Sequence, residues 1–539
     1  MILNYTVDNI QKTVDSSNAA VTIVEKQEGF RKIVEITALE KMTLNAAQFE
    51  FDHQYSKDNR FFVNGYQSWT DSFEYAYSDK LKDVNKLPKK LLQLYSFDKY
   101  GDGYFYKYQK NVFHGFDVSY VSGKNPFFVG NNNFRNAYLI IEHHKKAGKL
   151  FLKSDVDGII LEKGQTFTLF DYFLSEDVEK GKEVYFAQFP APKAEKLFGY
   201  TSWYNHYQDI NEAIIMGALN NTTEHFDLFQ IDDGFEEYVG DWLKIDGKKF
   251  PSGLKPIVDK AHEKGMKAGI WLAPFAAEEK SALFHEHPDW FCKDEKENFI
   301  KCGSNWSGFY ALNIENPDAV SYIKKTLSFY KDLGFDFFKL DFLYAVNVMK
   351  QAGKSRAQVA QKAYELLRNE LEGKLILGCG AVLSNSFGLF DYLRVGPDVS
   401  LIFDDVWYMR HMHRERISTK VTLRNTIYRK MFDGKVFLND PDVFLLRSHN
   451  IKLSKEQRQA ITTINSLFGS LLMTSDNPKH YAAEEDAFLK KAMYLFNNAR
   501  VTEVNTVKNF IKVSYKLDGK EHIIIYDIKK GVLRWTDQA

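Results

Sequence analysis

Short apolar segments alternate with helical segments between residues 191 and 482, and this alternation constrains the fold more than any other feature. It is typical of βαβ units, in which a buried parallel strand is followed by a helix that covers the sheet. Eight such units in succession predict a (β/α)8 barrel. The strand candidates are Phe198–Trp203, Leu228–Asp233, Ala268–Ala273, Phe337–Asp341, Leu375–Gly380, Tyr392–Asp398, Val436–Asp440 and Leu471–Asp476.

The helices between these strands carry recognisable end signals. One runs over Pro256–Lys264 and is followed by Gly265, a residue type that often ends helices because it tolerates a left-handed backbone. Another runs over Pro317–Leu333 and is followed in the same way by Gly334. Asn316 is its predicted N-cap, and the proline that follows occupies the first helical position.

The rest of the chain has the alternating pattern of antiparallel sheets. Five such runs before residue 190, separated by turn residues, predict a β-sandwich. They are Val21–Val24, Lys32–Ile36, Tyr138–Glu142, Gly158–Glu162 and Thr166–Phe170. Alternation returns in Val513–Lys516 and Glu521–Tyr526, which predicts a small C-terminal antiparallel β-domain. Since 539 residues are too many for one core, we predict a multidomain α/β protein with domains at residues 1–190, 191–482 and 483–539.

Composition excludes several classes of partner. The formal net charge is zero, so there is no electrostatic case for nucleic acid or an anionic membrane as partner. The three cysteines, Cys292, Cys302 and Cys379, lack paired zinc-ligand spacing, and their odd number argues against a disulfide framework. Cys379 has no evident histidine partner, so a nucleophilic thiol is not expected. Neither a signal-peptide pattern nor a membrane-spanning apolar stretch is present, and we expect a cytoplasmic protein.

Two of the predicted strands end on a carboxylate, Asp341 in one and Asp398 in the other. Active sites of (β/α)8 barrels lie at the carboxyl ends of the strands. Two carboxylates on neighbouring strands suggest cleavage of a glycosidic bond by a nucleophile and an acid. Any single aspartate at such a position is often the N-cap of the next helix, but six of the eight strand candidates lead into polar residues, which caps alone do not explain.

Flanking residues favour different protonation states for these two carboxylates. Lys339 lies two residues before Asp341 and on the same face of the strand, where its ammonium would lower the carboxylate pKa and suit a nucleophile. The alternative is a buried structural ion pair. Asp398 follows Gly396-Pro397, which favour a bend that lifts the carboxylate into a cleft. Partial desolvation and a nearby anion would raise its pKa, as a general acid requires. The alternative is a turn-forming aspartate.

The pair Asp232-Asp233 also lies at a predicted strand end. Acceptor-only groups side by side can each bridge two sugar hydroxyls, and they can also bind a hard cation. We favour the sugar, because no histidine or glutamate cluster converges on the pair. His285-Glu286-His287 lacks the HExxH spacing and is interpreted as part of a packed loop. Neither a metal ion nor an organic cofactor is expected.

Four aromatic residues could stack on a sugar ring: Trp69, Trp203, Tyr207 and Trp271. Single aromatic rings are more often core than ligand platform. Trp69 is the exception, because the turn-rich segment Asn64–Trp69 predicts an exposed loop.

Taken together, these segments resemble the α-galactosidases of glycoside hydrolase family 36, in a compact bacterial subgroup. The resemblance runs from the Gln-Ser-Trp loop to at least Asp476. The segments that carry it are Asn64–Trp69, Gly199–Tyr204, Gln230–Phe235, Gly269–Phe275, Phe338–Leu343, Leu377–Gly380, Arg394–Asp398 and Asn439–Asp442. The resemblance implies a β-supersandwich, a (β/α)8 barrel and a C-terminal antiparallel β-domain.

The resemblance also implies roles for individual residues. Asp341 corresponds to the catalytic nucleophile and Asp398 to the general acid/base. Asp232 and Asp233 correspond to the pair that holds galactose through O4 and O6. The residues that correspond to the rest of the sugar site are Lys339, Arg394, Trp271, Cys379, Trp203 and Trp69.

The function that follows is a retaining, exo-acting α-galactosidase that releases terminal galactose from melibiose-type and raffinose-type oligosaccharides. The alternatives are an α-N-acetylgalactosaminidase, a galactosyl transferase of the raffinose-synthase type, a non-catalytic sugar-binding protein and a metal-dependent barrel hydrolase. The fold alone does not decide among them. The expected partners are small α-galactosides, and no oligomer interface can be read from the sequence.

Overall fold

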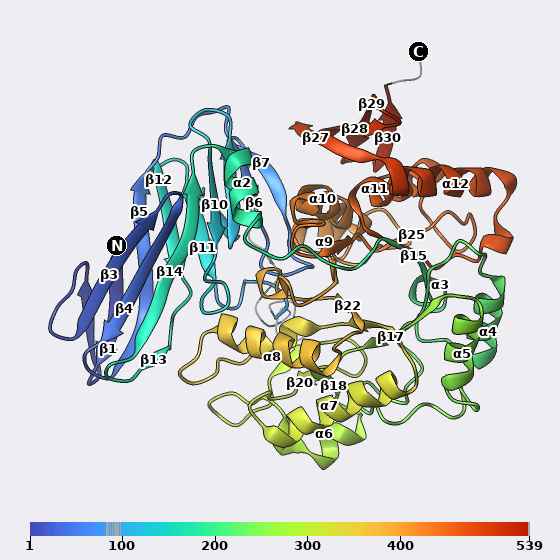
Figure 1. The fold of residues 1–539 in the computed structure, drawn as a ribbon, viewed down its shortest axis with the longest axis horizontal. Helices are drawn as coiled ribbons and strands as arrows, with labels where there is room; N and C mark the ends of the chain where they lie inside the picture. The colour runs from blue at the N-terminus through green and yellow to red at the C-terminus, as the bar shows by residue number, and fades with distance from the viewer. Residues whose placement is uncertain (82–85, 87, 89, 91–95, 97–98, 537–539) are drawn as a thin grey trace.

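A parallel sheet forms the centre of the structure, a computed structural model that describes residues 1–539 except 82–85, 87, 89, 91–95, 97–98 and 537–539 (Figure 1). Each of the eight predicted strands occurs in this sheet. In chain order the sheet contains β15 (Leu197–Thr201), β16 (Leu228–Ile231), β17 (Lys267–Leu272), β21 (Phe337–Leu340), β22 (Leu375–Gly378), β23 (Tyr392–Arg394), β24 (Leu438–Asp440), β25 (Val443–Phe444) and β26 (Leu471–Thr474). The predicted (β/α)8 fold class is confirmed.

The barrel closes through a strand that is broken in the middle. β24 pairs with β23 on one side, whereas β25, only three residues further on, pairs with β26 on the other. The break is Pro441-Asp442, and Asp442 has a left-handed backbone with φ of 73°. Proline lacks a ladder donor and the positive φ turns the chain, so the two halves can face different neighbours.

Helices follow the strands, with the end signals that the sequence predicts. Asn316 caps α7 by accepting from the backbone N–H groups of Asp318 and Ala319, and Gly265 and Gly334 have φ of 77° and 101°. The helices of this region are α3 (Trp203–His206), α4 (Glu212–Asn221), α5 (Lys255–Glu263), α6 (Ala282–Glu286), α7 (Pro317–Asp332), α8 (Arg356–Glu370), α9 (Trp407–Met412), α10 (Thr419–Tyr428), α11 (Lys455–Phe468) and α12 (Ala483–Asn498). Short 3₁₀ helices are η1 (Pro288–Trp290), η2 (Leu343–Asn347), η3 (Ser384–Ser386), η4 (Arg429–Phe432) and η5 (Pro478–His480).

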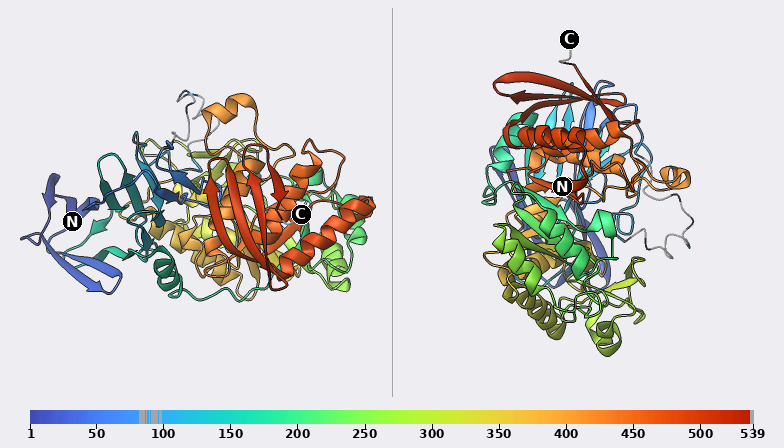
Figure 2. Two further views of the ribbon diagram at one scale, coloured as in Figure 1. Left: turned by 90° about the horizontal axis from the view of Figure 1, so that it is seen from above. Right: turned by 90° about the vertical axis from the view of Figure 1, so that its right-hand side faces the viewer.

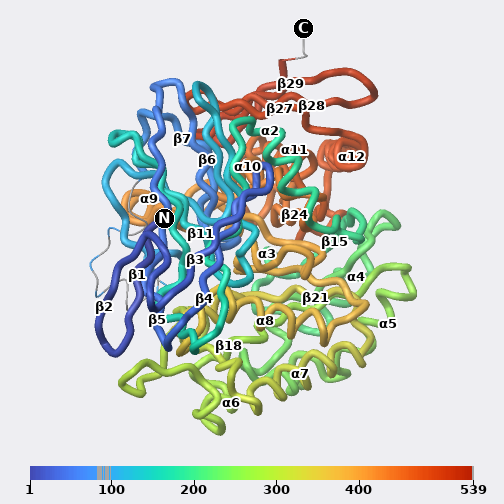
Figure 3. Tube along the Cα trace, turned by 60° about the vertical axis from the view of Figure 1, so that its left-hand side comes forward, coloured from blue at the N-terminus to red at the C-terminus, as the bar shows by residue number. Residues whose placement is uncertain are grey.

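Two antiparallel sheets build the N-terminal sandwich, which comes forward in Figure 3. The first contains β1 (Ile2–Val7), β2 (Ile10–Val14), β5 (Met42–Asp52), β8 (Phe113–Phe116), β11 (Leu139–His144), β12 (Lys149–Ser154) and β13 (Ile160–Leu161). The second contains β3 (Val21–Glu28), β4 (Arg31–Ala38), β6 (Arg60–Val63), β7 (Phe73–Ala76), β9 (Val118–Ser122), β10 (Phe127–Asn131) and β14 (Thr166–Ser175). Their inward side chains form a separate apolar core, and α2 (Val178–Phe186) packs on the second sheet.

Smaller sheets complete the fold. β18 (Ala276–Glu278), β19 (Lys301–Gly303) and β20 (Phe309–Ala311) form a three-stranded sheet between β17 and α7. The C-terminal sheet contains β27 (Arg500–Val507), β28 (Phe510–Leu517), β29 (Lys520–Asp527) and β30 (Val532–Trp535), and it lies over α11 and α12 (Figure 2). The predicted domain limits at 190/191 and 482/483 fall between strands of different sheets, and the division itself stays a prediction.

The loop that carries Trp69 is buried rather than exposed, so the expectation of an exposed loop is wrong. Ser68 donates its backbone N–H to the Ala381 carbonyl, and Ala381 donates in return to the Ser68 hydroxyl, both at 2.9 Å. A β-bridge joins Gln67 and Val382 beside them. The turn residues therefore serve to dock the sandwich onto the barrel.

Among the described residues, no helix has both the length and the apolar character that crossing a membrane requires.

Candidate active site

A cavity of about 390 Å³ opens at the carboxyl ends of the barrel strands. Among the sequence-predicted site residues, its lining includes Trp69, Trp203, Asp232, Asp233, Trp271, Lys339, Asp341 and Asp398. The predicted convergence of β-strand ends and a sandwich loop thus brings these side chains together. One detail of the prediction is wrong: β22 lies between β21 and β23, so the two carboxylates follow alternate strands, not neighbouring ones. Alternate strands of a barrel contribute to the same layer of side chains.

Asp341 is held rigidly at the end of β21. Its backbone N–H donates to the Leu272 carbonyl at 2.8 Å, which extends the pairing of β21 with β17 by one residue. The Trp271 indole Nε1 donates to one carboxylate oxygen at 3.0 Å, and the Phe342 backbone N–H donates to the other at 2.8 Å. Both oxygens accept N–H groups, as those of an anion do, and the side chain keeps one orientation toward the cavity.

The sequence suggested that Lys339 acts beside Asp341, but its ion pair is with Asp232. Lys339 Nζ lies 2.8 Å from Asp232 Oδ2, and both side chains are buried. Burial alone would lower the pKa of Lys339, but Asp232 and Asp341 together raise it above its ordinary value, so the ammonium stays charged. Thr201 and Gln230 also donate to Asp232, at 3.2 and 2.7 Å. The lysine therefore places a fixed positive charge between two carboxylates.

Asp398 faces the same cavity in a different electrostatic state. Its side chain is 37% exposed, and desolvation by the cavity walls raises its pKa against the opposing effects of Arg394 and Lys339. Asp341 raises the pKa further. Arg394 donates to Asp398 at 3.0 Å and also pairs with Asp440 and Asp442, at 2.7 and 2.9 Å. Because this guanidinium is shared by three carboxylates, it orients Asp398 without fully neutralising it.

Asp233 lies next to Asp232 but has different partners. Trp306 Nε1 donates to Asp233 Oδ2 at 2.9 Å, and Gln208 Nε2 lies 3.1 Å from both carboxylate oxygens. Burial raises the pKa of Asp233, although these donors oppose the shift. Burial, followed by the proximity of Asp233, also raises the pKa of Glu236. The donors leave Asp233 in a fixed orientation at the cavity wall.

Aromatic rings line the cavity beside the carboxylates. Trp69 meets Phe342 and Tyr344 edge-on, with ring centroids 5.3 and 5.6 Å apart. Trp306 packs against Phe342 and Trp271, at 5.0 and 6.1 Å. The Trp69 indole N–H has no hydrogen-bond partner among the described residues, although it is buried. The cavity therefore combines apolar faces with a few fixed polar groups, which is the usual composition of a small-molecule site.

Three predicted site residues do not line this cavity. Arg394 is buried and does not line the cavity, but it donates to Asp398, which does. Cys379 is fully buried, and burial raises the pKa of its thiol, so it is not ionised at neutral pH. Tyr207 is 40% exposed and meets Trp203 edge-on, 5.1 Å between ring centroids.

Several lining residues escaped the sequence prediction because they lie on loops without a pattern. The additional residues include Gln208, Trp306, Phe342, Tyr344, Asp405, His413 and Glu415. Gln208 and Trp306 are detectable only through their contacts with Asp233. A usable signal existed at Phe342 and Tyr344, since they are the first and third residues after the carboxylate at a strand end, and both line the cavity.

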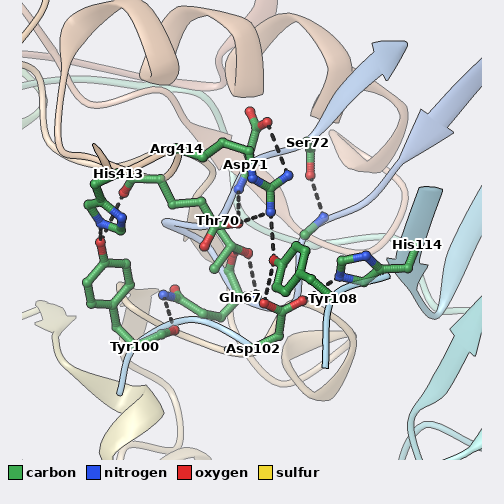
Figure 4. A network of polar contacts seen from close by, with 12 residues as sticks. Gln67, Thr70, Asp71, Ser72, Tyr100, Asp102, Tyr108, His114, His413 and Arg414 are labelled. Atoms are coloured by element: carbon green, nitrogen blue, oxygen red, sulfur yellow. Dashed lines mark hydrogen bonds and ion pairs between the residues drawn. The ribbon is translucent and has the colours of Figure 1, made fainter. Parts of the chain in front are cut away.

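A polar network joins the sandwich loop to the loop after α9 (Figure 4). The Tyr100 hydroxyl hydrogen-bonds His413, and the Tyr100 carbonyl accepts from Gln67 at 2.8 Å. Arg414 donates to the Tyr108 hydroxyl at 2.7 Å. These contacts fix the rim of the cavity on the side where Trp69 enters.

Glu415 is a buried acid within this network. Its Oε1 accepts from the Asp71 backbone N–H at 3.2 Å and pairs with Arg414 at 3.3 Å, while its Oε2 has no partner among the described residues. Burial, with the nearby charges of Asp102 and Asp71, raises the pKa of Glu415 to about 8, although Arg414 opposes the shift. The side chain is therefore mostly uncharged at neutral pH.

We expect Glu415→Gln to remove a pH-dependent loss of stability. Because the folded-state pKa of about 8 exceeds the ordinary 4.5, the folded protein binds more protons than the unfolded chain between these values. The wild-type free energy of unfolding should therefore fall as pH rises from about 5 to about 8. Denaturant titrations at several pH values should show a shallower fall for Glu415→Gln, and an unchanged fall for Glu484→Gln on the surface. Parallel curves for wild type and Glu415→Gln would contradict the assignment.

Among the described residues, no group of three or more histidine, cysteine, aspartate or glutamate side chains is arranged to hold a metal ion.

The fold and the cavity together define a (β/α)8-barrel protein that presents acidic and aromatic side chains to a small-molecule ligand. Residues 195–372 match the family model described as Melibiase. A curated relative, alpha-galactosidase 1 of Pediococcus pentosaceus, is 26% identical over 194 residues, which are 33% of this chain. The match spans only 25% of the length of that relative.

Solved structures of similar fold cover nearly the whole chain. An alpha-galactosidase from Thermus thermophilus in complex with stachyose aligns with a TM-score of 0.71 at 23% identity, over 92% of this chain and 99% of that one. The family 36 alpha-galactosidase AgaA from Geobacillus stearothermophilus aligns with a TM-score of 0.63 at 12% identity, over 94% and 72%. With the Melibiase match, these findings confirm the resemblance to family 36 that the sequence motifs indicate.

Proposed function

We propose that this protein is a retaining, exo-acting α-galactosidase that acts on small galacto-oligosaccharides. The observation that carries the proposal is a pair of carboxyl groups with unlike surroundings in one cavity. Asp341 accepts two N–H groups beside a charged lysine, whereas Asp398 is desolvated next to an anion and its pKa is raised. Two carboxyl groups whose environments separate their protonation states are the arrangement that glycosidases use.

The reaction proceeds in two displacements. In the first, Asp341 attacks the anomeric carbon while Asp398 gives its proton to the leaving oxygen, so the glycosidic bond breaks and a galactosyl ester forms on Asp341. In the second, Asp398 takes a proton from water, the water oxygen attacks the anomeric carbon, and the ester bond breaks. Two inversions give net retention, and α-galactose leaves with Asp341 and Asp398 in their starting protonation states.

Recognition of galactose is assigned to the carboxylate pair that follows β16. Asp232 and Asp233 are buried and have fixed donors, so their free lone pairs can accept from the axial O4 and from O6 of the sugar. Lys339 would donate to a sugar hydroxyl while it pairs with Asp232. Trp69, Trp203 and Trp271 supply the apolar surfaces that the faces of the ring need.

The first experiment is hydrolysis of p-nitrophenyl α-galactoside followed by proton NMR. We expect α-galactose as the first product, with the β-anomer appearing later by mutarotation. Turnover of the α-N-acetylgalactosaminide in its place would keep the mechanism and change the substrate. Galactosyl transfer to an added sugar, with little release to water, would favour the transferase. No turnover of either glycoside and no transfer would refute the proposal.

We expect the effect of Asp398→Ala to depend on the leaving group. Nitrophenolate departs without a proton, so kcat/KM for p-nitrophenyl α-galactoside should change little, while that for raffinose should fall roughly 10²–10⁴-fold. Because wild-type Asp398 must be protonated, raffinose kcat/KM should decline as pH rises through its raised pKa. Asp405→Asn alters another aspartate of the same cavity, and it should keep the wild-type kcat/KM for both substrates and the wild-type pH dependence on raffinose. Equal losses of kcat/KM on the two substrates would show that Asp398 is not the general acid.

A further inference from the structure

A second cavity, of about 240 Å³, lies between the sandwich loop and the helices that follow β23. Seven lysine and arginine side chains line it, with Asp71 as the one carboxylate among the described lining residues. The cations are Lys80, Lys86, Arg410, Arg414, Arg416, Lys420 and Arg424. The whole chain has a formal net charge of zero, so this gathering is a local feature and not a reflection of a basic protein.

Carboxylates around the cavity balance only part of this charge. Asp71 is fully buried and pairs with Arg424 at 2.6 Å, with Arg414 further away at 3.8 Å. Asp404 binds Arg416 at 2.8 Å and lies 3.6 Å from Lys420. Glu415, the other nearby acid, is mostly uncharged because its pKa is raised to about 8. Among the described residues, Asp71 and Asp404 are thus the two charged carboxylates that form ion pairs with these seven cations.

Two of the lining arginines are not fully satisfied by these carboxylates. The Nε–H groups of Arg414 and Arg424 are buried, and neither has a hydrogen-bond partner among the described residues. An unsatisfied buried donor on a charged group is costly. Lys420 gives independent support, since burial and then the nearby Arg424 and Arg416 lower its pKa despite its contact with Asp404.

We propose that this cavity binds a phosphate group. Arginine forks match the oxygens of a phosphate, and lysines add point charge without fixed geometry. A cavity of this volume suits one such group with its water shell, rather than a long polyanion. Arg416 lines both this cavity and the catalytic one, so a phosphate bound here lies one side chain away from the outer end of the proposed substrate.

Two sources share this chemistry: free inorganic phosphate, and a phosphoryl group on the aglycone of a galactoside. The second source rests on the proposed function, whereas the first does not. Binding is therefore measured first without any sugar, by titration calorimetry of the full-length protein with sodium phosphate. Sodium chloride keeps the ionic strength constant, because exposed cations attract any anion weakly at low salt.

We expect saturable phosphate binding that weakens at least tenfold in the Lys86→Gln/Lys420→Gln variant. Lys430→Gln is the matched control, because it also removes a half-buried lysine paired with an aspartate but lies away from the cavity. Its affinity should stay within twofold of wild type. If the double variant does not fold, Arg410→Gln, at an exposed position, replaces it.

Kinetics then distinguishes the sources. A phosphoryl-bearing galactoside whose KM rises in Lys86→Gln/Lys420→Gln, with the KM of melibiose unchanged, assigns the site to substrate. Phosphate binding without such a difference assigns it to the free anion. No saturable binding by wild type, or equal affinity in wild type and variants, would overturn the proposal, whatever the hydrolysis assays show.

Discussion

The Asp341→Ala variant should lose about 10⁴-fold or more in kcat on p-nitrophenyl α-galactoside, the scale of effect seen when a catalytic nucleophile is removed. The methyl side chain cannot form the galactosyl ester, and it leaves the Trp271 and Phe342 N–H groups without the carboxylate that they hold in wild type. Added azide is small enough to occupy the vacated space. It should restore turnover and give β-galactosyl azide, because a single displacement inverts the anomeric carbon.

A graded comparison separates chemistry from folding. Trp271→Phe keeps an aromatic ring but removes the indole donor to Asp341, and we expect a smaller loss, about 10²–10³-fold in kcat, because one preorganised donor is lost. The thermal unfolding midpoints of both variants should stay close to wild type. Azide rescue that yields the α-azide, or a kcat of Asp341→Ala within tenfold of wild type, would show that Asp341 is not the nucleophile.

The second large effect is expected from Arg429→Met, a change remote from the reacting carboxylates. Arg429 is fully buried and donates five hydrogen bonds: to the carbonyls of Gln67, Ser68, Thr70 and Val395, and to the Ser72 hydroxyl. Burial lowers its pKa to about 9, so it remains charged at neutral pH. Methionine fills similar volume but leaves these carbonyls without a donor.

We expect Arg429→Met to lower the free energy of unfolding by about 3–5 kcal/mol, as when one partner of a buried charged network is removed. Urea denaturation followed by tryptophan fluorescence measures the loss. Folded Arg429→Met should also bind substrate more weakly, because the loop that Arg429 holds carries Trp69. Lys430→Met, the adjacent and partly exposed residue, should cost less than about 1 kcal/mol. Comparable losses in the two variants would argue against the network.

Strand ends were the predictable part of this protein. Periodicity and end signals identified all eight barrel strands and placed Asp341, Asp398 and Asp232 on one edge of the sheet. This succeeds because parallel strands have one buried pattern and their carboxyl ends must converge when the barrel closes. Trp69 was already a stacking candidate, and the resemblance to family 36 added its place in the barrel site, which no periodicity could indicate.

The contacts of individual buried cations were not predictable from the sequence. Lys339 is close to Asp341 in sequence and on the same face of its strand, yet it pairs with Asp232 from β16. Spacing along one strand fixes the face on which the Lys339 side chain lies. Its ion-pair partner depends on which acidic residues the adjacent strands place near it. The role of Arg429 could not be predicted for a similar reason. Most of its acceptors are backbone carbonyls, which every residue carries and no sequence motif marks.

The docked Trp69 loop also has a consequence in time. The backbone N–H of Ser72 donates to Asn425, a residue 353 positions later in the chain. At translation rates of about 5–20 residues per second, the loop is synthesised roughly 20–70 s before the helix that receives it. A growing chain carries Asp341, the proposed nucleophile, before Asn425 and Arg429 exist to dock the Trp69 loop. The cavity is therefore completed late in synthesis. Until then, the loop that carries Trp69 lacks its docking contacts on the nascent chain.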